Sequence, residues 1–196
     1  MKDLTFHIFD LVENSVKAGA TRLWVDLIMD GRMLTMELRD NGPGFPEAVL
    51  KAPADPDSTT RTERPVGLGL ALMRESARAT GGTLTAANAE NGGARVSVTL
   101  FPGHIDARPL GDVAACFTDL LAAWPSLDMT VRTGEAAELK TIFDSRTIRQ
   151  EVSEDECNHP SIRRFIANEL TRGFQPLTDW YDSLRDTALT TTTSEV

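Results

Sequence analysis

Three polar side chains near the start of the chain have the types and spacing needed to bind a metal ion and phosphate. Within residues 6–20, FHIFDLVENSVKAGA, Asp10, Asn14 and Lys17 occur at i, i+4 and i+7, which places them on one face of a helix. A carboxamide oxygen can bind Mg2+, a carboxylate can orient water, and an ammonium group can meet phosphate. The alternative is an ordinary solvated helix face.

The same segment has the apolar pattern of a helix that covers a core. The apolar side chains on roughly the opposite face are Ile8, Leu11, Val12 and Val16. Gly19 follows the last periodic position, where a helix C-terminus is expected. We therefore predict a short helix with a polar line above a buried stripe.

Two later stretches contain glycines at positions that suit close contact with a ligand. In residues 40–45, DNGPGF, Asp40 can accept a hydrogen bond from an exocyclic amine, and Gly42 and Gly44 allow the backbone to approach. The alternative here is a plain turn. In residues 66–72, VGLGLAL, the paired glycines open a helix.

The candidate phosphate-binding loop of the second stretch is Gly67, Leu68 and Gly69. Its backbone N–H groups and the positive end of the helix dipole can hold phosphate together. The side chain of Leu68 also has the pattern of a packing residue. A flexible helix start is the alternative, because a single Gly-X-Gly is a weak signal.

Together, in this order, the three stretches resemble the nucleotide boxes of the GHKL superfamily, which groups DNA gyrase, the large heat-shock chaperones, sensor histidine kinases and the mismatch-repair ATPase. The resemblance covers about the first half of the chain. It implies an α/β two-layer sandwich, the Bergerat-type ATP-binding fold, with ATP and Mg2+ as ligands. It also implies that Asp40 bonds the adenine amino group and that Asn14 holds Mg2+.

The resemblance makes residues 52–65 a lid over the ATP, and it makes Thr59, Thr60, Arg61 and Arg64 candidates for contact with phosphate. Sensor kinases usually have a phenylalanine just before a Thr-Thr pair in this lid. Here the stretch is Asp57-Ser58-Thr59-Thr60, without that aromatic anchor. Ala94 stands where kinase-like relatives often have a threonine near the adenine.

Asp10 is the candidate catalytic residue. Gyrase and the mismatch-repair ATPase have a glutamate at this position as the base that activates water, and sensor kinases have an asparagine. An aspartate keeps the carboxylate but is one methylene shorter. Lys17 resembles the phosphate-binding lysine of the kinases, and we expect Glu13 to pair with it at i+4.

A sensor kinase has a phosphoacceptor histidine upstream of the first box. We expect none here, because the first box lies at the start of this sequence. We expect His7 to be structural or to lie at the pocket rim. Phosphoryl transfer is then expected to go to a separate protein, as in the compact anti-sigma kinases. The resemblance also implies that this partner is a regulatory or hydrogenase-associated protein. Two alternatives stay open: a non-hydrolysing, ATP-gated interaction module, and an unrelated α+β domain.

The elements expected to position these residues form two hairpins and two helices. Alternating apolar residues predict strands over 22–29 and 33–39, joined by a turn at Asp30-Gly31. A short helix is expected over 46–51, a helix over 66–80, and a second hairpin from 83–88 and 95–101. The pattern indicates an antiparallel sheet with helices on one face.

Beyond residue 103 the pattern changes, and we predict a small C-terminal α+β module. Its expected elements are a connector at 103–111, helices over 112–123, 146–152 and 160–172, and strands over 127–132 and 139–144. Gly173 is expected to end the last helix. The predicted division is an ATP-binding domain over 1–103, the module over 104–185, and a disordered tail over 186–196.

Composition limits the class of protein. The 196 residues have a net charge of -9, which argues against nucleic-acid binding. No apolar run has membrane-spanning length and no signal peptide is evident, so we expect a cytoplasmic protein. Cys116 and Cys157 are far apart, and Cys157 with His159 supplies only two potential metal ligands.

Overall fold

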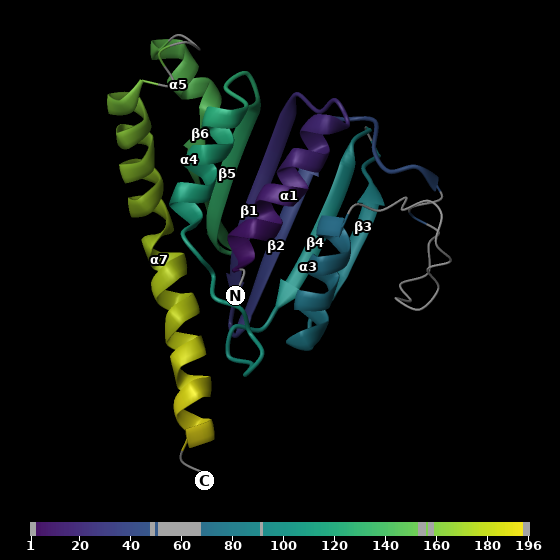
Figure 1. Cartoon of the computed structure of the whole chain (residues 1–196), viewed down its shortest axis with the longest axis vertical. Helices are drawn as coiled ribbons and strands as arrows, with labels where there is room; N and C mark the ends of the chain where they lie inside the picture. Colours follow the sequence, from purple (N-terminus) through teal and green to yellow (C-terminus); the bar gives the residue numbers. More distant parts are fainter. Residues whose placement is uncertain are drawn as a thin grey trace.

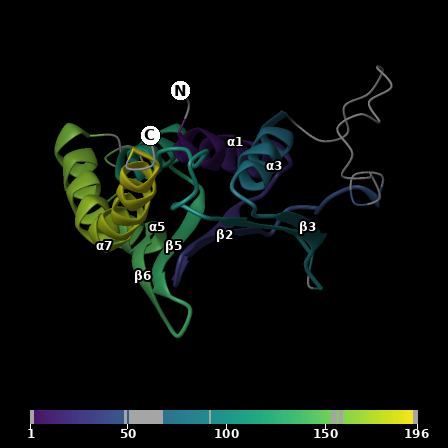
Figure 2. The same cartoon turned by 90° about the horizontal axis from the view of Figure 1, so that it is seen from below.

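The computed structural model describes residues 3–47, 50, 68–90, 92–152, 156 and 159–193. They form two layers: a twisted sheet, and the helices packed together on one face of that sheet (Figures 1 and 2). The strands are β1 (Arg22–Asp30), β2 (Met33–Asp40), β3 (Leu84–Asn88), β4 (Ala94–Leu100), β5 (Asp128–Glu135) and β6 (Glu138–Asp144). The two-layer α+β sandwich expected from the sequence is confirmed.

The six-stranded sheet has the order β3-β4-β2-β1-β5-β6. The two hairpins of the first half pair in antiparallel fashion, with β2 against β4. Strand β5 pairs with β1 in parallel, so the sheet is mixed. Residues beyond the expected boundary at 103 therefore extend the same sheet.

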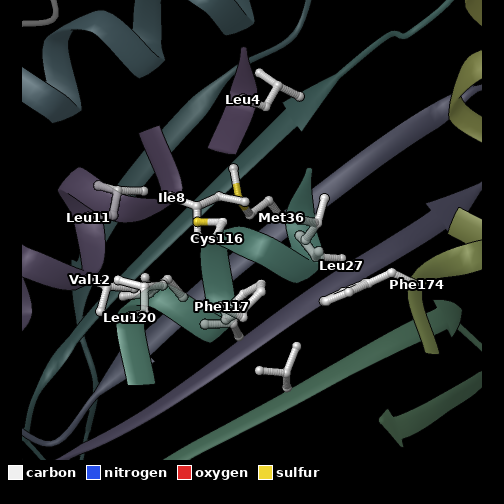
Figure 3. Packing of buried hydrophobic residues seen from close by; sticks show 14 of the residues in the cluster. Leu4, Ile8, Leu11, Val12, Leu27, Met36, Cys116, Phe117, Leu120 and Phe174 are labelled. Atoms are coloured by element: carbon white, nitrogen blue, oxygen red, sulfur yellow. The ribbon is translucent and has the colours of Figure 1, made fainter. Parts of the chain in front are cut away.

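Inward-facing apolar residues alternate with outward-facing residues along the strands, and the inward-facing ones form the core. Leu23, Val25 and Leu27 of β1 are buried against the helices, as are the matching apolar residues of β2, β4 and β5. Figure 3 shows apolar side chains from α1 (Leu4–Lys17), α4 (Val113–Ala123) and α7 (Pro160–Thr193) gathered in one cluster with them. One continuous core thus joins the two halves of the sequence.

In the first half of the chain, a glycine with positive φ follows the first helix and another lies in the turn of the first hairpin. Helix α1 ends at Lys17, and Gly19 follows with a φ of 96°, as the sequence predicts. The first hairpin differs by one residue from the prediction. Asp30 pairs with Met33, so the turn is Gly31-Arg32, with Gly31 alone at a positive φ of 57°.

Helix α3 (Leu68–Ala79) crosses beside α1, and Gly81 follows it with a φ of 80°. The second predicted hairpin is present as β3 and β4. Glu47 and Leu50 are helical, in agreement with the short helix expected there. The predicted lid over 52–65 lies outside the described residues.

Asp26 of β1 faces away from the helices but is only 3% exposed. Its carboxylate accepts hydrogen bonds from Arg132 Nε of β5 at 2.7 Å and from Arg39 Nη2 of β2 at 3.1 Å. The two arginines shield the carboxylate from water, which explains its burial on the open face. This ion pair also ties β5 to the first half of the chain.

The second half contains α4, α5 (Ser145–Glu151) and α7. The side chain of Asp112 caps α4 by accepting from Ala115 N at 2.8 Å. Phe117 of α4 stacks on Phe174 of α7, with ring centroids 5.5 Å apart. Within the described residues, no helix is both long and apolar enough to cross a membrane.

Helix α7 corrects the prediction that Gly173 ends the last helix. The helix continues through Gly173 and Pro176 to Thr193, across residues 186–193, where a disordered tail was expected. Glycine and proline cost roughly 1 and 3 kcal/mol in a helix. Burial of Phe174, Leu177 and Tyr181, at about 1.5–3 kcal/mol each, offsets that cost.

The second part of α7 is also held by polar contacts to the connector and the first hairpin. Tyr181 Oη donates to Arg108 O at 2.7 Å, and Arg185 Nε donates to Ala107 O at 3.2 Å. Trp180 Nε1 donates to Gly31 O at 3.3 Å. In the first part of the helix, Phe165 is 54% exposed.

Candidate functional site

A pocket of about 200 Å³ opens between α1, the loop after β2, and the start of α3. It brings together all three sequence stretches that contain candidate binding residues. Asn14 comes from the first, Asp40 and Gly44 from the second, and Leu70 from the third. The remaining lining residues are Leu11, Ser15, Ala18, Leu38, Pro43, Phe45, Pro46, Ala94 and Val96.

Asp40 is the most firmly held polar group of this pocket. It ends β2 and is 7% exposed. Its Oδ1 accepts hydrogen bonds from Gly42 N at 2.9 Å and Ala94 N at 3.0 Å, and its Oδ2 accepts from Ser15 Oγ at 2.6 Å. These bonds fix the orientation of the carboxylate before any ligand enters.

Two glycines allow the backbone to pass close to Asp40. A β-carbon on Gly93 would lie 1.9 Å from Asp40 O, and one on Gly42 would lie 3.2 Å from Asp40 Oδ1. The sequence predicts that Gly42 makes room for a ligand. The contact that it makes in this structure is with the carboxylate of Asp40 itself.

Asn88, at the end of β3, holds the loop that forms one wall of the pocket. Its Oδ1 accepts from Phe45 N at 2.6 Å, and its Nδ2 donates to Phe45 O at 3.0 Å. Gly44 lies against the same amide, because a β-carbon there would be 2.7 Å from Asn88 Oδ1. Its φ of 79° also suits glycine.

The start of the same loop is fixed by Asn41. Its Oδ1 accepts from Thr21 N and Arg22 N at 2.9 and 2.8 Å, and its Nδ2 donates to Thr21 Oγ1 at 2.9 Å. Sequence reasoning missed Asn41, Phe45 and Asn88 as contributors. An Asn within a Gly- and Pro-rich turn is a general signal for such bonding, but it does not identify the partner.

The three polar residues predicted to share one face of α1, namely Asp10, Asn14 and Lys17, do not all line the pocket. Asn14 is exposed and lines the pocket. Lys17 Nζ is 3.0 Å from Glu13 Oε2, which confirms the predicted pair. Asp10 is half-buried and packs against the start of α3, where a β-carbon on Gly69 would lie 2.8 Å from Asp10 Cβ.

The remaining candidate residues are placed as follows. Leu68 begins α3. Thr60, Arg61 and Gly67 lie outside the described residues. His7 of α1 is buried, and its Nε2 lies 3.1 Å from Oγ of Ser76 in α3, in agreement with a structural role.

The pocket thus combines an immobilised acceptor at its base with a carboxamide at its rim. Ala94, whose side chain cannot make the polar contact of a threonine, still supplies its N–H to Asp40. Apolar walls from Leu11, Leu38 and Val96 suit a flat ring system. A planar heterocycle with an amino group fits these features.

Comparison with known proteins adds independent information. The C4-dicarboxylate transport sensor protein DctB of Pseudomonas aeruginosa is 46% identical over 88 residues, which are 44% of this chain and 14% of that protein. The signal transduction histidine-protein kinase AfsQ2 of Streptomyces coelicolor is 36% identical over 95 residues, covering 46% of this chain and 18% of the relative. The sensor protein KdpD of Escherichia coli is 39% identical over 98 residues, covering 47% and 11%.

The chain therefore spans less than a fifth of the length of each of these relatives. The family described as histidine kinase-, DNA gyrase B-, and HSP90-like ATPase matches residues 2–104. This range is more than half of the chain and includes α1, the loop after β2, and α3, whose residues form the pocket. The chain belongs to the histidine kinase-, DNA gyrase B-, and HSP90-like ATPase family.

Proposed function

We propose that the chain binds ATP in the pocket, with the adenine against Asp40 and the phosphates toward Asn14 and Lys17. The observation with the greatest weight is the Asp40 carboxylate, whose Oδ1 already accepts two backbone N–H groups. Its Oδ2 is then the oxygen best placed to accept a further donor, as from the amino group of adenine. Family membership supports ATP as the nucleotide.

Mg2+ fits the rim of this pocket. The ion usually keeps several waters and binds through one or two protein oxygens together with substrate phosphates. Asn14 offers one carboxamide oxygen at the exposed edge, and the phosphates would supply the other ligands. Bound Mg2+ would neutralise phosphate charge.

The phosphate contacts proposed from the sequence extend from the pocket to the start of α3. Lys17 would exchange its surface pair with Glu13 for a phosphate, which costs little because exposed pairs contribute about 0.5 kcal/mol. The backbone at Gly67, Leu68 and Gly69 would bind phosphate at the helix N-terminus. Thr60 and Arg61 are the proposed lid contacts.

The reaction that we propose is ATP hydrolysis or transfer of the γ-phosphoryl group to a separate protein. The relatives named as a histidine-protein kinase and as sensor proteins support kinase-like chemistry. Catalysis would consist mainly of positioning and charge neutralisation. Asp10 is the proposed activator of water.

A second candidate function is an ATP-gated interaction module that does not hydrolyse ATP. One observation favours it: in the described part of the chain, the pocket lining includes Asn14 but not Asp10, which packs against Gly69 of α3. A carboxylate in that position supports the structure of the α1–α3 contact more directly than it supports proton transfer.

Calorimetric titration with ATP, ADP and GTP, with and without Mg2+, tests the binding proposal. Asp40→Asn keeps the Oδ1 acceptor but turns an amide N–H toward the pocket, so we expect the affinity for ATP to fall at least about tenfold. Asp30→Asn, at an exposed strand end, is the matched control. Absence of ATP binding by the unchanged chain at millimolar nucleotide would contradict the proposal.

Turnover separates the two functions. ATP hydrolysis that falls at least about a hundredfold in Asp10→Asn, with ATP affinity retained, would support a water-activating carboxylate. If the wild type and Asp10→Asn both bind Mg-ATP and both release phosphate only at the rate of a protein-free control, hydrolysis is excluded. Transfer of labelled phosphate to a protein acceptor then distinguishes the kinase from the interaction module.

A further inference from the structure

Ser15 is a buried polar residue of the pocket to which the sequence assigned no role. It follows Asn14 on α1, is 7% exposed and lines the pocket beside Asp40. Its Oγ lies 2.6 Å from Asp40 Oδ2, and the hydroxyl donates. The bond crosses from α1 to the end of β2, so it links two of the three stretches that form the site.

The direction of this hydrogen bond decides what the pocket offers to a ligand. A carboxylate accepts only, and a serine hydroxyl has a single hydrogen. Once that hydrogen points at Asp40, Ser15 Oγ can present only lone pairs elsewhere. Because Asp40 Oδ1 accepts from Gly42 N and Ala94 N, the base of the pocket presents Asp40 Oδ2 and Ser15 Oγ, both as acceptors.

We propose that Ser15 is a specificity-determining residue that makes the pocket select a purine with an amino group, and not an oxo group, at C6. This inference rests on the proposed binding of ATP. An amino group supplies hydrogens to the two acceptors. A 6-oxo purine places a carbonyl oxygen there, and three acceptors then face one another without a shared hydrogen.

The contribution of Ser15 is distinct from that of Asp40. Removal of the hydroxyl leaves Oδ2 without its partner from α1, so the carboxylate can turn or bind a water that donates toward the ligand. A donating water would satisfy a 6-oxo group. Discrimination between the two purines then falls, although the carboxylate is still present.

The test compares Ser15→Thr with Ser15→Val, a pair of nearly equal shape that differ in the hydroxyl. ATP and inosine triphosphate, each with Mg2+, are titrated calorimetrically into the whole chain. We expect the ratio of the two dissociation constants to be the same in wild type and Ser15→Thr and to shrink roughly five- to tenfold in Ser15→Val. Ser76→Ala removes another buried serine hydroxyl, outside the pocket lining, and leaves the ratio unchanged.

Each remaining outcome overturns a defined claim. Equal ratios in wild type, Thr and Val variants, or an equal loss of affinity for both nucleotides in Ser15→Val, would show a merely structural serine and overturn the inference, while ATP binding by the wild type stands. A wild type that binds neither nucleotide overturns the proposed function and this inference together. If thermal unfolding shows that the branched variants do not fold, Ser15→Ala against wild type gives the same comparison.

Discussion

Gly69 of α3 lies so close to Asp10 of α1 that a β-carbon on the glycine would stand 2.8 Å from Asp10 Cβ and 3.3 Å from its Oδ2. The 2.8 Å contact is closer than real β-carbons allow, and Asp10 Cβ is attached directly to the backbone of α1, so it cannot move aside. The two helices therefore meet at this point because the residue on α3 has no side chain. A carboxylate beside a helix N-terminus is also favourable electrostatically.

We predict that Gly69→Ala separates the start of α3 from α1. The expected loss of unfolding free energy is about 1–3 kcal/mol, as for other overpacked sites, with weaker ATP binding because α3 borders the pocket. Urea unfolding and calorimetry measure the two effects. Gly103→Ala is the control, because a β-carbon there meets only Leu184 O at an ordinary 3.5 Å. Equal stability of the two variants would contradict the prediction.

Asn88→Ala is predicted to loosen the wall of the pocket more than it destabilises the fold. The variant loses both hydrogen bonds to Phe45, at about 1 kcal/mol each or less because the side chain is exposed. We expect a roughly three- to tenfold loss of ATP affinity. Thr85→Ala, at an exposed position of the same strand, tests the alternative that any side-chain truncation in β3 lowers the affinity for ATP. ATP affinity that falls equally in both variants would exclude a specific role for Asn88.

Local patterns were sufficient to predict most elements that position the pocket. The apolar stripe of α1, the alternation of β1 and β2, and the glycines around β3 and β4 each depend on residues close in sequence. The turn error at Gly31 has a local cause too. Only one turn residue needed a positive φ, so Asp30 could remain in the strand.

Contacts between distant residues explain what the sequence did not predict. The parallel pairing of β1 with β5 joins residues about 106 positions apart, and nothing in either strand specifies that neighbour. Asn88 and Phe45 are 43 residues apart. Helix α7 passes through Gly173 and Pro176 because burial outweighs propensity, and burial depends on the whole core.

Asp26 is expected to matter for stability because it joins both halves of the chain on the open face of the sheet. Asp26→Ala leaves Arg39 and Arg132 without the carboxylate between them. We expect a loss of roughly 2–3 kcal/mol, at the low end for broken buried pairs since both guanidinium groups are about a third exposed. Glu138→Ala removes the exposed partner of Lys140 and should change stability by less than about 0.5 kcal/mol. Urea unfolding that gives the same midpoint for both variants would exclude this role.

From the burial of Tyr181 we predict how the free energy of unfolding changes at alkaline pH. Burial raises its pKa from 10.0 to about 12, with Arg185 lowering it and Asp182 adding to the rise. The unfolded tyrosine loses its proton near pH 10. Between pH 10 and 12 the native state therefore holds more protons, and the unfolding free energy falls as pH rises, by up to about 1.4 kcal/mol per pH unit. The contribution is complete below pH 10.

Tyr181→Phe should flatten that slope, although it also lowers stability at neutral pH by removing the hydrogen bond to Arg108 O. Burial raises the pKa of Cys116 from 9.0 to about 12 as well, so the thiol adds a decline of the same sign that begins one unit lower. Urea unfolding at pH 8, 9, 10 and 11 in Cys116→Ala and in Cys116→Ala/Tyr181→Phe separates the two groups. Parallel curves above pH 10 would mean that Tyr181 ionises in the native state as readily as in the unfolded chain, and that α7 does not keep water from its hydroxyl.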